Sequence, residues 1–256
     1  MSQAVYSCTA LVGTGKKGVL PQDGNGYYDT ILGAFDYFNN KNMYYDFNAV
    51  REIFQASSDL MRRIKNGNLH GECGHPRRLP GMSAAEFMHR CLDIQEPNIS
   101  HHIREVWIDD KTLVDPSGKP IVAVRAWVKP AGPKGPALKE AYDNNAQNVC
   151  FSVRSFADEK QGPNKSIIRL IRLLVTWDWV MEPGINIANK YSHPALESFV
   201  TDQYLSESIL EEAANLQRTL GIANESANDM LGILMKSFRP ATATGTIIAR
   251  PGSHNW

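Results

Sequence analysis

The sequence predicts an α+β fold, in which a mainly antiparallel β body carries helices between its strands and further helices toward the C-terminus. Two kinds of pattern predict it. Apolar, strand-like runs separated by turns rich in Pro, Gly and Asp lie at residues 98–109, 121–128 and 148–156. Residues 205–220 and 226–237 instead repeat Leu, Ile and Met at helical spacing, which is typical of helices packed on a core.

The remaining elements follow from local signals. Residues 5–12 and the apolar run 167–181 are expected to be extended, and the polar residues 157–166 a surface loop. Three helices are expected between the strands, at residues 47–65, 84–91 and 137–145. Asn66-Gly67 stops the first helix, and Ser83 with Glu86 forms a capping box before the second. We expect one main domain over residues 1–200 and a C-terminal helical segment with a tail over 201–256.

Composition narrows the possible functions. The chain has 256 residues, 43% of them hydrophobic, which is enough for a substantial core. Its formal net charge is zero, which argues against nucleic-acid binding through bulk charge. The chain has no apolar stretch of about 18 residues and starts without a basic, apolar leader, so we expect a soluble intracellular protein and no membrane partner. The four cysteines lack CxxC spacing, which suits a reducing compartment.

The most informative stretch is residues 66–76, Asn-Gly-Asn-Leu-His-Gly-Glu-Cys-Gly-His-Pro. A turn leads into a short extended segment that ends at His75, and Pro76 holds His75 in extended geometry. Gly71 and Gly74 leave room for another chain to approach closely. The segment therefore presents an imidazole in a fixed place beside a neighbouring strand.

Ser152 and Asp178 are the candidate partners of this imidazole. A serine hydroxyl becomes a nucleophile when a neutral imidazole takes its proton, and a third group that fixes the imidazole tautomer improves the reaction. Asp178 lies between two tryptophans on an apolar strand, where a carboxylate is costly unless it is paired. A second interpretation of Asp178 is a carboxylate on the wet face of a half-buried strand. Arg154 shares a strand face with Ser152 and is a candidate for stabilising negative charge there.

At these residues the chain resembles the tailed-phage prohead proteases of the large-myovirus type. The resemblance spans about residues 67–184, nearly half of the chain, and its short motifs follow the family's order. The motifs are Gly71-Glu72-x-Gly74-His75-Pro76, Ser100-His101, Val106-Trp107-Ile108, Phe151-Ser152-Val153-Arg154 and Thr176-Trp177-Asp178-Trp179-Val180.

The resemblance implies a serine endopeptidase with Ser152 as nucleophile, His75 as general base and Asp178 as the orienting acid. It also implies a small β-barrel surrounded by helices, as in herpesvirus assembly proteases. In those relatives the third member is a histidine, so His101 or His102 is the runner-up for Asp178. Ser155 stands where the family often has glycine, which makes it a minor alternative nucleophile.

The resemblance further implies the substrates, the location and the cleavage specificity of the enzyme. Such enzymes digest scaffold and trim major capsid proteins inside the phage procapsid, which assembles in the bacterial cytoplasm, and they cut after Glu. They need no cofactor, metal or nucleic acid, and a homo-oligomer is possible. Basic residues at the cleft would bind the Glu carboxylate, and the candidates are Arg77, Arg78 and Arg154.

The resemblance also makes self-trimming a hypothesis. The sequence carries the expected Glu-containing sites in its C-terminal third, at residues 195–198, 205–208, 210–213 and 223–226. Cleavage there would remove part of the C-terminal helical segment.

Three competing hypotheses remain open. His70, Cys73 and His75 are close in sequence, with His101-His102 as a further ligand source, and could form a metal site. Cys150 or Cys73 with a histidine could form a cysteine peptidase. The third hypothesis is a non-enzymatic virion or scaffold protein with the same fold.

Overall fold

The computed structural model describes residues 4–12, 20, 22–38, 43–114, 120–181, 203–220 and 225–238. The strands of this part are β1 (Ala4–Val12), β2 (Tyr28–Phe35), β3 (Met43–Tyr45), β4 (His70–Glu72), β5 (Ile99–Asp109), β6 (Val122–Pro130), β7 (Cys150–Gln161), β8 (Ile167–Val180) and β9 (Gln203–Leu205). The helices are α1 (Phe47–Val50), α2 (Asp59–Lys65), α3 (Ala84–Leu92), α4 (Gly135–Asp143), α5 (Glu207–Leu220) and α6 (Glu225–Phe238), with 3₁₀ turns at Arg51–Phe54, Glu96–Asn98 and Pro163–Lys165. The expected domain boundary at residue 200 and the tail after residue 238 lie outside the described residues.

The described strands form two sheets, so the expected α+β class with antiparallel pairing is confirmed. One sheet has the order β3-β8-β7-β1-β9 and the other β2-β6-β5-β4. Within these sheets only the short β3–β8 pair is parallel. The sheets meet just after β4, where Cys73 bridges to Trp179 and the Gly74 N–H donates to the Trp179 carbonyl at 2.7 Å. A single closed barrel is not seen among the described strands, and the likeness to herpesvirus proteases stays a prediction.

The predicted helix over residues 47–65 is wrong in its continuity. The structure has α1, a 3₁₀ turn and then α2, with a break before Ser58. The Ser58 hydroxyl accepts the Met61 N–H at 3.2 Å and donates to the Ile53 carbonyl at 2.5 Å, so it starts α2 and closes the turn before it. The capping box of Ser83 and Glu86 at the start of α3 is confirmed.

The predicted surface loop at residues 157–166 is too long, because only residues 162–166 form a turn and residues 157–161 belong to a strand. β7 continues to Gln161 and pairs with β8 down to a tight turn, in which the Gly162 N–H donates to the Ser166 carbonyl at 2.8 Å. Cross-strand ion pairs, Glu159 with Arg169 and Asp158 with Arg172, join the polar part of this hairpin. Paired charges therefore let a polar sequence form strands, which composition alone does not reveal.

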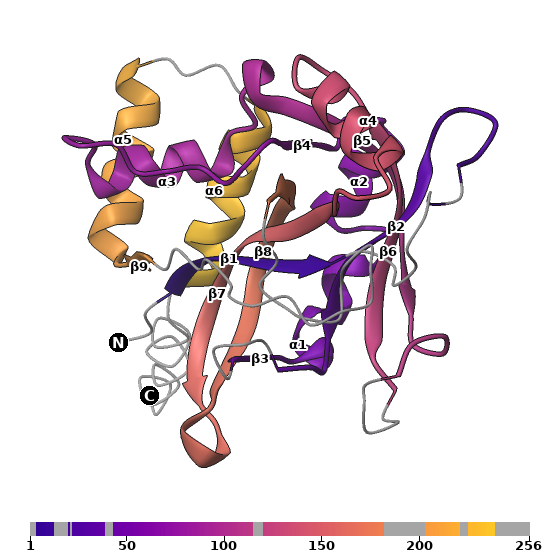
Figure 1. Cartoon of the computed structure of the whole chain (residues 1–256). Coiled ribbons are helices and arrows are strands. Elements are labelled where there is room, and N and C mark those ends of the chain that lie inside the picture. The colour runs from indigo at the N-terminus through magenta and orange to yellow at the C-terminus, as the bar shows by residue number, and fades with distance from the viewer. Residues whose placement is uncertain are drawn as a thin grey trace, which may run out of the picture.

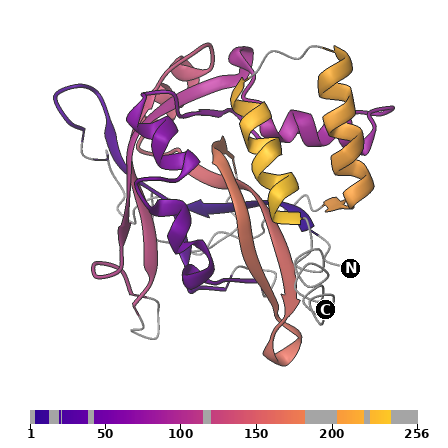
Figure 2. The same ribbon diagram turned by 180° about the vertical axis from the view of Figure 1, so that it is seen from behind.

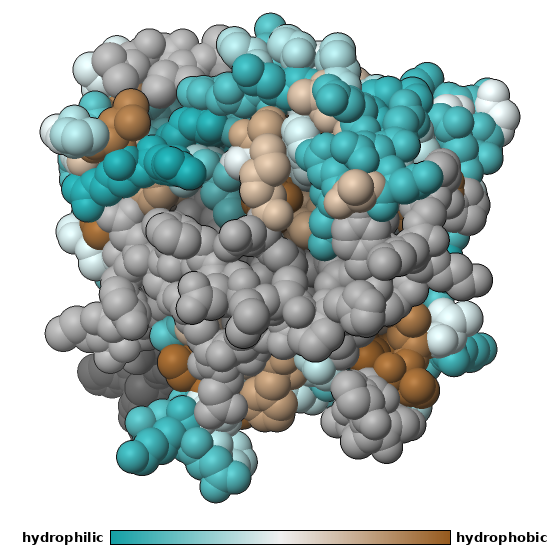
Figure 3. Space-filling view, in the orientation of Figure 1, coloured by the Kyte–Doolittle hydropathy of each residue, from teal (hydrophilic) through white to brown (hydrophobic). Residues whose placement is uncertain are grey.

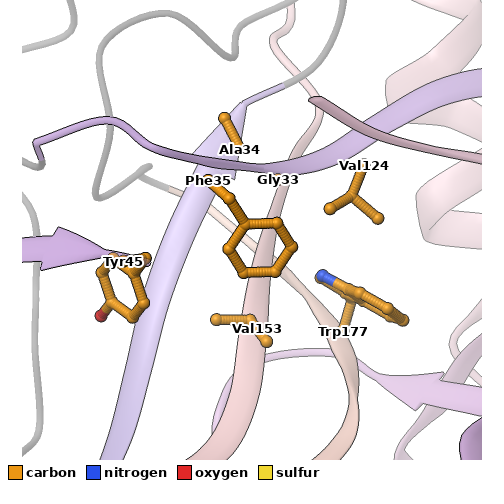
Figure 4. Close-up of a pocket in the computed structure, with 7 residues that line it drawn as sticks. All are labelled: Gly33, Ala34, Phe35, Tyr45, Val124, Val153 and Trp177. Carbon is orange, nitrogen blue, oxygen red and sulfur yellow. The ribbon is translucent and has the colours of Figure 1, made fainter. Parts of the chain in front are cut away.

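The larger core lies between the two sheets and takes in residues of α1, α2 and α4. Figure 4 shows a small cavity inside it, about 10 Å³ in volume, which is lined by Gly33, Ala34, Phe35, Tyr45, Val124, Val153 and Trp177. Its lining is mainly apolar, so we regard it as a packing gap.

A second core joins three helices to the first sheet. α3, α5 and α6 pack on one another and α6 packs on β8, as Figures 1 and 2 show from opposite sides. The residues that fill it include Phe87, Met88, Cys91, Phe156, Leu173, Val175, Leu210, Ala213, Met230, Leu231 and Leu234. The C-terminal helices thus cover the face of the sheet on which α3 lies.

The described surface is mainly hydrophilic on the face drawn in Figure 3, with scattered apolar residues. Among the described residues, the large apolar side chains that are exposed to solvent are Phe38, Leu79, Val114 and Met181. No described helix is long and apolar enough to cross a membrane.

Candidate active site

The site lies on the central strands of the first sheet. Ser152 of β7 and Asp178 of β8 are direct partners in the antiparallel register, so their side chains share one face. β4 runs beside β8 at this point, and the Thr176 hydroxyl donates to the His70 carbonyl at 2.6 Å. This contact brings the segment that ends at His75 over the strand pair.

Glycines make this approach possible. A Cβ on Gly71 would lie 2.0 Å from the Trp177 carbonyl oxygen, so another residue there would push β4 away from β8. Gly74 has a φ of +79°, in the left-handed region that favours glycine, and turns the chain just before His75. The predicted close approach of another chain at Gly71 is confirmed.

The structure brings together the three predicted residues. His75 Nε2 lies 2.5 Å from Ser152 Oγ, and His75 Nδ1 lies 2.9 Å from Asp178 Oδ2. Ser152 and Asp178 are fully buried, whereas the His75 side chain is 16% exposed. Residues separated by 77 and 103 positions in the chain thus form one hydrogen-bonded row.

Asp178 is the best-connected member of this row. It accepts the Glu72 N–H at 3.0 Å and two hydrogen bonds from Arg154, at 2.8 and 2.7 Å, in addition to His75. Burial raises the pKa of Asp178, but the Arg154 charge and the His75 hydrogen bond outweigh it, so the pKa lies well below its usual range. The wet-face interpretation of Asp178 is therefore wrong.

The ionised carboxylate decides the tautomer of His75. Because Asp178 has no proton to donate, the hydrogen sits on Nδ1 and the neutral ring leaves Nε2 as an acceptor. Nε2 faces the Ser152 hydroxyl, so it is placed to accept the hydroxyl proton. This arrangement can generate a serine nucleophile.

Arg154 lies on the strand face that the sequence predicted, but its neighbours differ from the prediction. It is fully buried and donates to Asp178 and to the Asp93 carbonyl, and its Nη2 lies 3.1 Å from Glu72 Oε2. This places it behind the carboxylate, so the predicted direct role in binding an oxyanion or substrate is not supported. Arg77 is exposed two positions after His75, and Arg78 donates to the Met82 carbonyl at 2.9 Å, so Arg77 remains the better candidate for substrate contact.

Sequence reasoning missed the roles of Glu72 and Arg90. Glu72 is 1% exposed and forms a two-point ion pair with Arg90 of α3, at 2.5 and 3.1 Å. The position of Glu72 inside the Gly71–His75 motif was a signal that could have been used, because a carboxylate in a segment that packs closely on another strand is buried and needs a partner. Nothing in the sequence pointed to Arg90 as that partner.

The runner-up histidines have different partners. His101 Nδ1 bonds to the Ser100 hydroxyl at 2.9 Å, and burial lowers the pKa of His101 to about 3, so the ring is neutral. His102 bonds to the Tyr27 hydroxyl and the Gly67 carbonyl, both at 3.0 Å. None of these three hydrogen bonds involves His75.

The minor candidate nucleophiles and the metal site lack the geometry that their chemistry needs. The Ser155 hydroxyl is buried and has no hydrogen-bond partner among the described residues, so none of them is placed to activate it. Burial raises the pKa of the Cys73 thiol, which disfavours a thiolate nucleophile, and Cys150 is buried in a small core cluster. Across the described residues, no group of three or more His, Cys, Asp or Glu is arranged to hold a metal ion, so the proposed His70/Cys73/His75 site is wrong.

Comparisons with known proteins identify the family of the chain. The sequence profile of the Peptidase S80 family matches residues 6–234. The chain belongs to the Peptidase S80 family. The chain is 39% identical over 202 residues to the "Capsid maturation protease" of Pseudomonas phage phiKZ, a match that covers 77% of this chain and 73% of that protein. The resemblance to phage prohead proteases is therefore confirmed.

Among solved structures, this S80 family member is similar to the bacteriophage T4 capsid assembly protease, gp21. The TM-score is 0.46 at 13% sequence identity, and the match covers 70% of this chain and 99% of that one.

Proposed function

We propose that this S80 peptidase is a serine endopeptidase of phage head maturation, with Ser152 as nucleophile, His75 as general base and Asp178 as the orienting acid. The observation that supports it most is the continuous row of hydrogen bonds from Ser152 Oγ through His75 to Asp178. This is the arrangement by which Ser-His-Asp hydrolases activate a serine for acyl transfer.

The proposed chemistry follows from the row. Ser152 Oγ attacks the scissile carbonyl carbon while His75 Nε2 takes the hydroxyl proton. The C–N bond then breaks, and the amine leaves with that proton, which gives an acyl ester on Ser152. Water attacks the ester with His75 again as base, and the carboxylic acid product leaves Ser152 with its proton restored. Asp178 stabilises the imidazolium formed in each half of the reaction.

The proposed substrates are scaffold and major capsid precursor proteins, cut after Glu inside the procapsid. The related phiKZ protein is named a capsid maturation protease, which supports this assignment by homology. Arg77, exposed beside His75, is proposed to bind the Glu carboxylate of the substrate. Arg77→Ala is then expected to raise KM for a Glu peptide more than it lowers kcat.

Self-trimming of the C-terminal segment is a further part of the proposal, and the helices restrict where it occurs. Glu211 and Glu212 lie within α5, and a peptide bond inside a folded helix does not fit an extended substrate groove. The candidate site at residues 195–198 lies outside the described residues, and that at 205–208 spans the junction of β9 and α5. Intact-mass analysis is expected to find no fragment that ends at Glu211 or Glu212.

The test uses an internally quenched peptide that contains Ala-Leu-Glu-Ser, taken from residues 195–198. The wild-type protein is expected to cut it after Glu, and Ser152→Ala to lose at least about a thousandfold in kcat/KM. Ser155→Ala is the matched control, since it removes a buried hydroxyl three positions along the same strand, and it should keep activity. Equal cleavage by wild type and Ser152→Ala would reject the serine mechanism, and no cleavage by either would favour a non-enzymatic virion protein.

A further inference from the structure

A row of buried charges continues from the candidate triad to helix α3. Asp178 is paired with Arg154, the same guanidinium lies 3.1 Å from Glu72, and Glu72 is paired with Arg90. The signs therefore alternate from the strand pair outward. The side chains of Asp178, Arg154 and Glu72 are at most 1% exposed, and that of Arg90 is 14% exposed.

Backbone groups fix both ends of this row. The Glu72 N–H donates to Asp178, while the Glu72 carboxylate accepts the Gln95 N–H at 2.6 Å. Arg90 and Arg154 both donate to the Asp93 carbonyl, at 3.1 and 2.9 Å, at the C-terminal end of α3. A helix C-terminus favours nearby positive charge, so α3 stabilises both guanidinium groups.

The charges also depend on one another. Arg154 alone would face two buried carboxylates, Asp178 and Glu72, with a surplus negative charge. Arg90 supplies the balancing positive charge through two hydrogen bonds to Glu72, at 2.5 and 3.1 Å. With Arg90 paired to Glu72, Arg154 donates from Nε and Nη2 to Asp178 at 2.8 and 2.7 Å, and its Nη2 lies farther from Glu72 Oε2, at 3.1 Å.

We infer that Glu72 and Arg90 are positioning residues, which act through Arg154 to hold Asp178 in the orientation that His75 requires. This inference rests on the proposed function of the triad and adds two members that do not touch the substrate. It also makes the site depend on α3, because Arg90 belongs to that helix.

The inference predicts opposite effects of two variants on the pKa of His75. Glu72→Gln removes a negative charge and disfavours the imidazolium, so the pKa falls. Arg90→Gln removes a positive charge and leaves Glu72 unbalanced, so the pKa rises. Removing one charge from this buried row is expected to shift the pKa of His75 by about half a unit or more. Neither variant alters Ser152, which bonds to His75, or Cys73 and the neutral His101, which lie near enough to Asp178 to interact with its charge. Lys134, whose charge acts on Cys73, is also unaltered.

The experiment measures kcat/KM for the Ala-Leu-Glu-Ser peptide against pH in wild type, Glu72→Gln, Arg90→Gln and Arg90→Lys. Both Gln variants are expected to lose at least about tenfold at pH 7. The acidic limb, which reports the base of the free enzyme, should move to lower pH in Glu72→Gln and to higher pH in Arg90→Gln. Arg90→Lys keeps the charge and should restore the wild-type limb.

Glu159→Gln is the matched control. It removes the carboxylate partner of Arg169, which is also fully buried, at the far end of β8. This variant should leave kcat/KM and its pH profile unchanged. A loss in Glu159→Gln as large as in Glu72→Gln, or shifts of the limb in the same direction in both Gln variants, would overturn the inference.

A readout without turnover separates this inference from the proposed function. The pKa of His75 is followed by NMR of histidine-labelled protein in the Ser152→Ala background. The same opposite shifts are expected there even if the peptide is not a substrate, and unchanged values would overturn the inference alone. If Glu72→Gln does not fold, the pair Arg90→Gln and Arg90→Lys decides in the same way.

Discussion

Asp178 carries a buried negative charge that four hydrogen bonds stabilise. The donors are the Glu72 N–H, His75 and two nitrogens of Arg154. The sequence left two interpretations of the carboxylate between Trp177 and Trp179, a buried and paired group or a group on the wet face of the strand, and the structure shows the buried and paired one. The two tryptophans lie in the core between the sheets. Asp178, which alternates with them along β8, points to the opposite face, where Ser152 and His75 lie.

We predict that Asp178→Asn lowers both activity and stability. Activity should fall about 10⁴-fold, since a neutral amide no longer fixes the His75 tautomer. The free energy of unfolding should fall by about 3–5 kcal/mol, because Arg154 loses a buried partner. Peptide cleavage and urea unfolding measure the two effects.

Asp158→Asn is the control, because it breaks an ion pair with Arg172, whose side chain is 45% exposed, and should cost about 1 kcal/mol or less. Equal stability losses in the two variants would mean that Asp178 is not held as the structure indicates.

His101 predicts a pH dependence of stability. Its pKa is about 3 in the folded protein, because of burial, and about 6.5 in the unfolded chain. The unfolded state therefore binds one more proton between these values, so stability should fall as the pH drops from about 6.5 toward 3, by up to about 1.4 kcal/mol per unit. Urea unfolding at pH 7, 6 and 5 measures the slope.

In His101→Gln, the slope of the free energy of unfolding against pH should decrease by the contribution of one proton, about 1.4 kcal/mol per pH unit at most. An identical slope in wild type and His101→Gln would show that His101 is not kept neutral by burial.

At the scale of elements, α3 links the C-terminal helices to the site. α5 and α6 cover α3 through the second core, and His89 of α3 contacts the Ala213 carbonyl of α5 at 2.5 Å. The predicted amphipathic helices thus have a packing role, as their apolar stripes indicated. Loss of α5 by self-trimming would uncover α3, which carries Arg90, and would weaken the support of the triad.

We predict that Leu210→Ala destabilises the protein by about 2–5 kcal/mol, because it opens a cavity between α5 and α3. Glu211→Ala on the exposed face of the same helix should change the free energy of unfolding by less than about 0.5 kcal/mol. Denaturant unfolding compares them. Similar values for the two would indicate that α5 is not packed on the body.

At the scale of the whole molecule, the sequence predicted what local chemistry determines. Turns, the Ser83 cap and alternating apolar runs located most strands and helices. Gly71 indicated that another strand approaches the backbone closely at that position. The sequence was a poorer guide to pairing between segments that lie far apart in the chain. The pairing of residues 157–161 with β8, the break before Ser58 and the arrangement of the strands in two sheets depend on partners distant in the chain.

The candidate site divides in the same way. The triad was predicted because family motifs marked His75, Ser152 and Asp178, and the structure brings these residues within hydrogen-bond distance. Arg154 was placed on the correct face but given the wrong neighbours, since a period of two fixes a side and not a partner. Arg90 lies on another element and carried no local signal.

The catalytic role of Ser152 is tested most directly by trapping the acyl-enzyme. An activated ester of an Ala-Leu-Glu peptide is mixed with the protein, the reaction is quenched in acid during turnover, and the acylated residue is identified by peptide mapping. We expect the acyl mass on Ser152, and none in His75→Gln. An acyl group on Cys73 or Ser155, or turnover without any covalent adduct, would contradict the proposed mechanism.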